Sequence, residues 1–235
     1  MSMLIAAAAF LAIHFLIAGT RIRDAITGAI GERVYLALFS LASLAIIVWL
    51  VMAYNKVNGS TNDRVLYNLG AVVKDAAIPI IAIAFFLVVQ SLLEPNPTAV
   101  GQEGRIGTGS GVHGVMRITR HPFLWGVAVW AAFHMAANGN LASIIFFGTF
   151  LALSVFGTFS IDAKRKRKLG DAWTDFSRKT SNIPFAAVLA GRNELKLGES
   201  FGWRFVVVMV VFLAVLFGHT RFIGVSPFPG GWTPY

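Results

Sequence analysis

The sequence predicts an all-helical, polytopic membrane protein that folds as a single bundle of about six transmembrane helices. Of its 235 residues, 56% are hydrophobic and only 13% are charged, whereas soluble domains carry about 25% charged residues. The apolar residues form long runs, and about 20 of them in a helix cross the roughly 30 Å hydrocarbon core of a bilayer. The length suits one domain over residues 1–235.

The net charge and the absence of cysteine exclude several classes of function. The chain has no cysteine, so it has neither a disulfide nor a thiolate nucleophile or metal ligand. Its net charge of +9 does not indicate nucleic acid, because basic residues in a membrane protein mark cytoplasmic loops and contact anionic lipid. The lipid bilayer, with anionic lipids at the basic loops, is therefore the expected partner.

Six apolar runs give the predicted spans, which are residues 1–20, 35–53, 71–93, 122–137, 141–161 and 205–218. Positive charge follows the first run at Arg21 and Arg23, whereas a signal peptide carries it before the run, so we expect a retained first helix. We interpret residues 22–33 as a short polar link. The proline- and glycine-rich stretch 94–121 predicts an irregular connection, and we expect the tail 219–235 to fold back onto the outer rim.

The distribution of basic residues predicts the orientation. With the N-terminus and the C-terminus outside, the inner loops are 20–34, 94–121 and 162–204, and they carry 16 of the 20 basic residues. This asymmetry follows the positive-inside rule.

The stretch 114–134 holds most of the candidate site residues. It begins as a basic loop and turns apolar at Arg120-His121-Pro122, and Pro122 suits the first turn of a helix. Counting helical rise from the inner boundary, we expect His134 roughly 18 Å and His14 roughly 9 Å inside the membrane. Ionisable residues within a membrane are costly and often mark a functional site.

Two buried histidines on separate helices suit bis-imidazole ligation of haem iron. A divalent metal normally needs more protein ligands, and buried carboxylates are scarce here. His14 and His134 are the predicted ligands, although their unequal depths leave His14 with His121 as an alternative pair. Arg117 and Arg120 could pair with haem propionates, because guanidinium groups match carboxylates. The histidines could equally serve only to hold helices together.

Several segments together resemble the NnrU family, which is associated with bacterial denitrification and with nitric oxide and nitrite reductase genes. The family is related to 15-cis-zeta-carotene isomerase. The segments that carry the resemblance are the histidine of the first span, Met116-Arg-Ile-Thr-Arg-His-Pro-Phe-Leu-Trp-Gly126, Trp130-Ala-Ala-Phe-His134 with the turn that follows, Thr180-Ser-Asn-Ile-Pro-Phe185, and the tail from His219 through Ile223-Gly-Val-Ser-Pro227.

This resemblance implies haem b held by the residues at the positions of His14 and His134. It also implies residence in a bacterial inner membrane, a link to nitric oxide and nitrite reduction, and isomerase-like activity on an apolar polyene. The isomerases carry a cysteine three residues before the second histidine, where this chain has Ala131, so ligand exchange through a thiolate is not expected.

Two other functions remain open. One is a non-catalytic membrane accessory protein. The other is an S-adenosylmethionine-dependent membrane methyltransferase, because isoprenylcysteine carboxyl methyltransferases resemble this chain in placing Arg-His-Pro at the start of a span and in the basic helix that follows. The paired glutamates that usually precede that helix are replaced here by Asp162-Ala-Lys164.

Overall fold

The structure, a computed structural model, describes residues 1–99, 101–102, 106 and 112–228. Parts of the predicted connection 94–121 and the end of the predicted tail lie outside these residues. In the described part of the chain every regular element is helical, apart from one isolated bridge between Val65 and Asn140. The predicted all-helical class is confirmed.

The first predicted span is a helix that changes type before it ends. It consists of α1 (Ser2–Ala12) and the π-helix η1 (Ile13–Ala18). The helix α2 (Arg21–Ile30) follows at an angle of 74°. The Thr20 hydroxyl caps α2 by accepting a hydrogen bond of 3.2 Å from the amide of Ile22. Residues 22–30 of the predicted polar link are therefore helical.

Two helices extend well beyond their predicted spans. The helix α3 covers Glu32–Val57, and α7 covers Leu141–Leu169, which includes the basic run after residue 163. Lysine and arginine are good helix formers, so this polar run prolongs α7 instead of ending it. The helix stops at Gly170, whose φ of 53° is left-handed.

The remaining predicted spans correspond to four helices. The third comprises α4 (Ala71–Asp75) and α5 (Ala77–Leu93), the fourth is α6 (Pro122–Ala137), and the sixth is α10 (Trp203–Ile223). Pro122 occupies the first turn of α6, as expected. A Cβ atom at Gly126 would lie 2.8 Å from the carbonyl oxygen of Ala84, so this glycine lets α6 pack closely on α5.

Among the described residues, three helices, α3, α7 and α10, are long and apolar enough to cross a membrane. The bent pair formed by residues 2–18 and 21–30 would make a fourth, while α5 and α6 are apolar but have only 17 and 16 residues. These lengths support a helical membrane protein. The count of six spans and the outward termini stay predictions.

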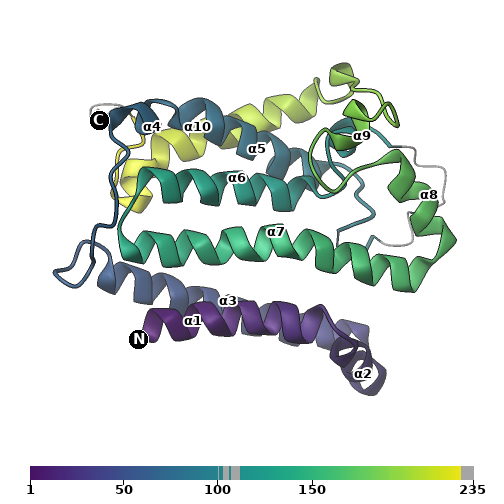
Figure 1. Ribbon diagram of the computed structural model, residues 1–235, viewed down its shortest axis with the longest axis horizontal. Coiled ribbons are helices and arrows are strands. Elements are labelled where there is room, and N and C mark those ends of the chain that lie inside the picture. Colours follow the sequence, from purple (N-terminus) through teal and green to yellow (C-terminus); the bar gives the residue numbers. More distant parts are fainter. Residues whose placement is uncertain (100, 103–105, 107–111, 229–235) are drawn as a thin grey trace.

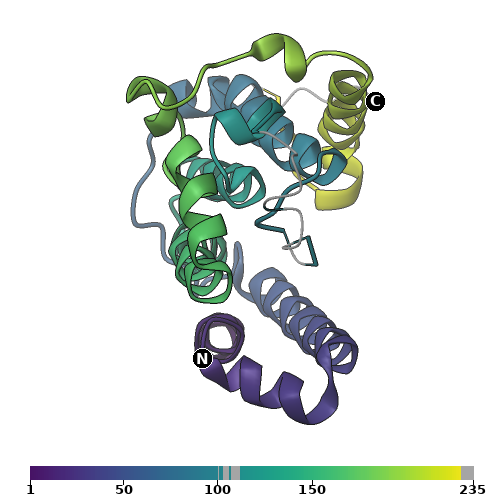
Figure 2. The ribbon, with the colours of Figure 1, turned by 90° about the vertical axis from the view of Figure 1, so that its right-hand side faces the viewer.

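The long helices lie side by side along the longest axis of the molecule (Figure 1). Turned by 90°, the structure shows α1, α2 and α3 on one side of α7, and α5, α6 and α10 on the other (Figure 2). Apolar residues of α1 and α3 pack against α7 around Ala6, Leu50 and Ala142. The C-terminal end of α7, α8 (Asp171–Lys179) and α9 (Ala186–Leu189) lie together at one end, which we call the basic end (Figure 1).

Candidate functional site

His14 lies within the π-helix η1, and its imidazole has a defined tautomer. Its Nδ1 donates a hydrogen bond of 2.8 Å to the carbonyl oxygen of Phe10. Because a carbonyl oxygen can only accept, Nδ1 carries the proton and Nε2 keeps its lone pair. The π-helix widens the backbone at this histidine, and such segments occur often at functional sites.

The His14 cavity, of about 510 Å³, opens beside this imidazole. Most of its wall is apolar and comes from η1, α3, α6 and α7, with Phe39 and Leu153 among the lining residues. Polar groups gather toward the basic end, where His121 and Lys164 line it. The cavity therefore suits an amphipathic molecule with an apolar body and an acidic edge.

His134 faces a different space, the His134 cavity, of about 240 Å³. Its Nδ1 donates to the carbonyl oxygen of Trp130 at 2.8 Å, which leaves Nε2 as an acceptor. His219 of α10 lines the same cavity, and its Nδ1 donates to the carbonyl oxygen of Val225 at 2.6 Å. His14, His134 and His219 thus share one arrangement, in which a backbone carbonyl sets the tautomer and Nε2 faces away from it.

A chain of aromatic rings connects the two cavities. The Phe10 ring lies 4.5 Å from the His14 ring and 5.7 Å from that of Phe150. Phe150 contacts Trp130 at 5.8 Å between centroids, and Trp130 contacts His134 at 5.0 Å. The two histidines are therefore linked by packed rings, although they line separate cavities.

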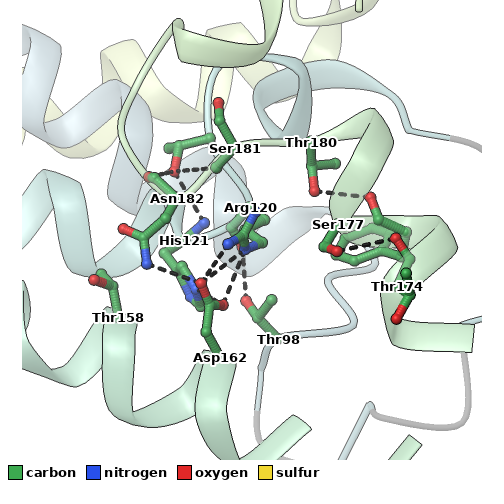
Figure 3. A network of polar contacts seen from close by, with 12 residues as sticks. Thr98, Arg120, His121, Thr158, Asp162, Thr174, Ser177, Thr180, Ser181 and Asn182 are labelled. Carbon is green, nitrogen blue, oxygen red and sulfur yellow. Dashed lines mark hydrogen bonds and ion pairs between the residues drawn. The ribbon is translucent and has the colours of Figure 1, made fainter. Parts of the chain in front are cut away.

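Asp162, near the C-terminal end of α7, is the centre of a polar network (Figure 3). Its carboxylate accepts hydrogen bonds from Nε of Arg120 at 2.9 Å, from Nε2 of His121 at 2.7 Å and from Nδ2 of Asn182 at 3.0 Å. The Nη2 atom of Arg120 also pairs with this carboxylate. The His121 side chain is buried and the Arg120 side chain is only 12% exposed, so their polar groups depend on Asp162 for partners.

The same network joins two distant parts of the chain at the basic end. The Thr119 hydroxyl donates to the carbonyl oxygen of Asn182 at 2.6 Å, and the Arg120 amide donates to that of Ser181 at 2.9 Å. The Phe185 amide donates to the carbonyl oxygen of Ile118 at 2.7 Å. These bonds hold the start of α6 against the segment that follows α8.

Arg117 lies in a separate ion pair. Its guanidinium binds both carboxylate oxygens of Glu199, at 2.7 and 2.9 Å. These hydrogen bonds lower the pKa of Glu199 to about 2. Glu94 lies nearby and is buried, and burial raises its pKa. The Arg117–Glu199 pair fixes the polar connection before α6.

The structure brings together only some of the predicted site residues. His14 and His121 line one cavity and His134 another, while Arg120 and Arg117 are each paired with a carboxylate of the chain. Nε2 of His121 is bonded to Asp162, so His14 and His134 are the two predicted ligands with a free Nε2.

The sequence analysis did not identify Asp162, Glu199 or His219 as site residues. The sequence did contain a signal for Asp162. It is a carboxylate at the end of an apolar run, and it lies at the same predicted inner membrane boundary as Arg120-His121. In the part of the chain that the structure describes, no group of three or more histidine, cysteine, aspartate or glutamate side chains is placed to hold a metal ion. A metal bound directly by protein side chains alone therefore has no candidate centre among these residues.

The profile of the NnrU family, described as "NnrU protein", matches residues 2–227. The chain belongs to the NnrU family. It is similar to the chloroplastic 15-cis-zeta-carotene isomerase of Zea mays, with 26% identity over 195 residues, which cover 81% of this chain and 52% of the isomerase. The enzyme of the same name from Arabidopsis thaliana is 28% identical over 176 residues, which cover 74% and 47% respectively.

This NnrU-family chain spans about half the length of the curated relatives that it matches. No solved structure matches it. The predicted resemblance to the NnrU family and its isomerase relatives is confirmed.

Proposed function

We propose that this NnrU-family protein is a membrane haem b protein, with His14 and His134 as the iron ligands, and that it isomerises an extended apolar polyene. The observation that carries the proposal is the shared state of the two imidazoles. In each, a carbonyl four residues earlier in the helix accepts from Nδ1, so that Nε2 is unprotonated. Haem iron binds such a neutral imidazole, and a hydrogen bond at the other nitrogen orients the ring and raises its basicity.

The residues around His14 fit haem in size and polarity. The cavity is mostly apolar, and its basic end carries the Lys164 ammonium group near His121. An ammonium group there matches a propionate edge. Arg117 and Arg120, which the sequence suggested for this role, are already paired with Glu199 and Asp162. In this proposal they hold the walls of the site in place.

Binding of one haem by both histidines has a structural consequence. His14 and His134 line different cavities, and the rings of Phe10, Phe150 and Trp130 form the chain of contacts between them. Ligation by both therefore requires these rings to repack. Ligation by His14 alone would need no such repacking, and absorption spectra of the loaded protein would distinguish the two cases.

When bound, haem iron supplies a redox-active centre beside the conjugated molecule. The chain itself supplies the rest of the chemistry. The apolar walls of the His14 cavity would exclude water from the bound haem, and the Phe10 carbonyl holds the His14 imidazole in one orientation. The similarity to 15-cis-zeta-carotene isomerases supports a polyene as the substrate class.

We also propose that the protein crosses the bacterial inner membrane six times with both termini outside, and that it supports nitric oxide and nitrite reduction. The placement of the N-terminus and the end of α10 at the same end of the bundle supports an even number of crossings (Figure 1). Nitrite consumption by a deletion strain under denitrifying conditions tests the respiratory role.

The cofactor itself is tested by a reduced-minus-oxidised spectrum of the purified protein after expression with adequate haem. We expect a Soret band and close to one haem per chain. A protein without a Soret band would overturn the haem proposal and favour a non-catalytic accessory role. Incubating the haem-loaded protein with a cis-polyene and separating the isomers by chromatography tests turnover independently.

A further inference from the structure

We propose that residues 183–203 form a surface that inserts into the headgroup region of an anionic lipid leaflet. We call it the interfacial surface and define it by its large exposed apolar side chains, which are Ile183, Phe185, Leu189, Leu195, Leu197, Phe201 and Trp203. This proposal does not depend on haem.

The interfacial surface exposes several large apolar side chains. Leu189 is 86% exposed, Trp203 63% and Ile183 58%. Single exposed apolar residues are ordinary, but their recurrence along 21 residues that contain only one short helix and one 3₁₀ turn marks an interaction surface. Aromatic residues such as Trp203 are enriched where protein meets the membrane–water boundary.

The backbone holds this segment firmly against the bundle, so the exposure is a feature of the fold. The Phe185 amide donates to the carbonyl oxygen of Ile118 at 2.7 Å, and Nε2 of Gln90 on α5 donates to the carbonyl oxygen of Ser200 at 2.6 Å. Phe185 has a left-handed φ of 64°, which is uncommon for a bulky residue. Its amide is nevertheless hydrogen-bonded to Ile118, while its side chain remains 45% exposed.

Charge and position identify lipid as the occupant. The interfacial surface lies at the basic end and leads directly into α10, which is apolar enough to cross a membrane (Figure 1). Within the surface, Arg192 and Lys196 balance Glu194 and Glu199, and the positive excess lies on the adjoining segment 164–179, which carries seven basic and two acidic side chains. Basic residues beside an apolar surface bind anionic headgroups. The apolar side chains then enter the boundary of the acyl region.

The absence of cysteine from the chain allows a direct test with single spin labels. Nitroxide labels are attached to Leu189→Cys and Ile183→Cys in vesicles of phosphatidylcholine and phosphatidylglycerol. The control is Glu194→Cys, in the same segment, whose native side chain is 81% exposed. Power saturation then compares the access of apolar oxygen and of a water-soluble nickel chelate to each label.

We expect the labels at 189 and 183 to be more accessible to oxygen than to the chelate, and the label at 194 to show the reverse. Vesicles of phosphatidylcholine alone should reduce the oxygen preference at 189 and leave 194 unchanged. Equal chelate access at 189 and 194 would overturn the proposal. Exclusion of both reagents at 189 would also overturn it, because that result indicates a protein partner. Insensitivity to phosphatidylglycerol would refute the requirement for anionic lipid.

Discussion

Replacing Asp162 by alanine should be among the most destabilising single changes at the basic end. The carboxylate is 17% exposed, and it is the shared acceptor for Arg120, His121 and Asn182. Removing it leaves the Arg120 guanidinium, only 12% exposed, without that counter-ion. The Nε2 atom of His121, on a side chain that is 1% exposed, loses its acceptor as well.

The expected cost follows from this burial. Breaking a buried ion pair by removing one partner costs about 3–5 kcal/mol, and exposed pairs contribute about 0–1 kcal/mol. Because Asp162 keeps some contact with solvent, we expect about 3 kcal/mol, toward the lower end of the buried range. For a chain of this size each kcal/mol lowers Tm by about 2–4 °C. The substitution should therefore lower Tm by about 6–12 °C.

Thermal unfolding of the protein in detergent, followed by intrinsic fluorescence, measures this shift. The matched control is Asp175→Ala on α8, whose contact with Arg178 is 3.9 Å long and whose side chain is 70% exposed. The control should change Tm by less than about 2 °C. If Asp162→Ala shifted Tm no more than the control does, the network would not stabilise the basic end, and our account of Arg120 and His121 would be wrong.

Two further predictions concern packing and pH. Gly126→Ala should lower the free energy of unfolding by about 1–3 kcal/mol, because the added Cβ would lie 2.8 Å from the carbonyl oxygen of Ala84. The control is Gly28→Ala, where a Cβ would meet nothing within 4 Å, and it should be neutral or stabilising in the same thermal assay. The pKa of Glu199, lowered from 4.5 to about 2 by its bonds from Arg117, means that this pair stabilises the fold fully above pH 4.5 and is lost as the pH falls toward 2. Glu199→Gln should therefore reduce the fall of Tm over that range, and an unchanged pH profile would contradict the assigned pair.

Sequence patterns predicted the helical class and the position of α6, because composition and Pro122 act locally. They did not predict the π-helix at His14, because such segments are rare and an apolar run predicts only a helix. They also did not predict how far α7 continues beyond the fifth span, because a basic run that leaves the apolar region still favours helix until Gly170 stops it.

The candidate site, like the fold, was predictable only where the interacting residues are close in sequence. Helical spacing made His14 and His134 candidates, and the bonds from each Nδ1 to a carbonyl four residues earlier are local. The partners of Arg117 and Arg120 are not local, because Glu199 lies 82 residues away and Asp162 lies 42 residues away. Only the folded structure shows that these two arginines are engaged by the chain itself.

The central claim is that His14 and His134 hold the haem, and the absorption and electron paramagnetic resonance spectra of the ferric proteins carrying His14→Ala or His134→Ala test it most directly. The matched control is His113→Ala, because His113 lies in the polar connection before α6 and lines neither the His14 nor the His134 cavity. We predict that His14→Ala and His134→Ala each lose the haem or its low-spin signal, while His113→Ala retains the wild-type spectrum. A wild-type spectrum and full haem content in either the His14→Ala or the His134→Ala protein would contradict the account.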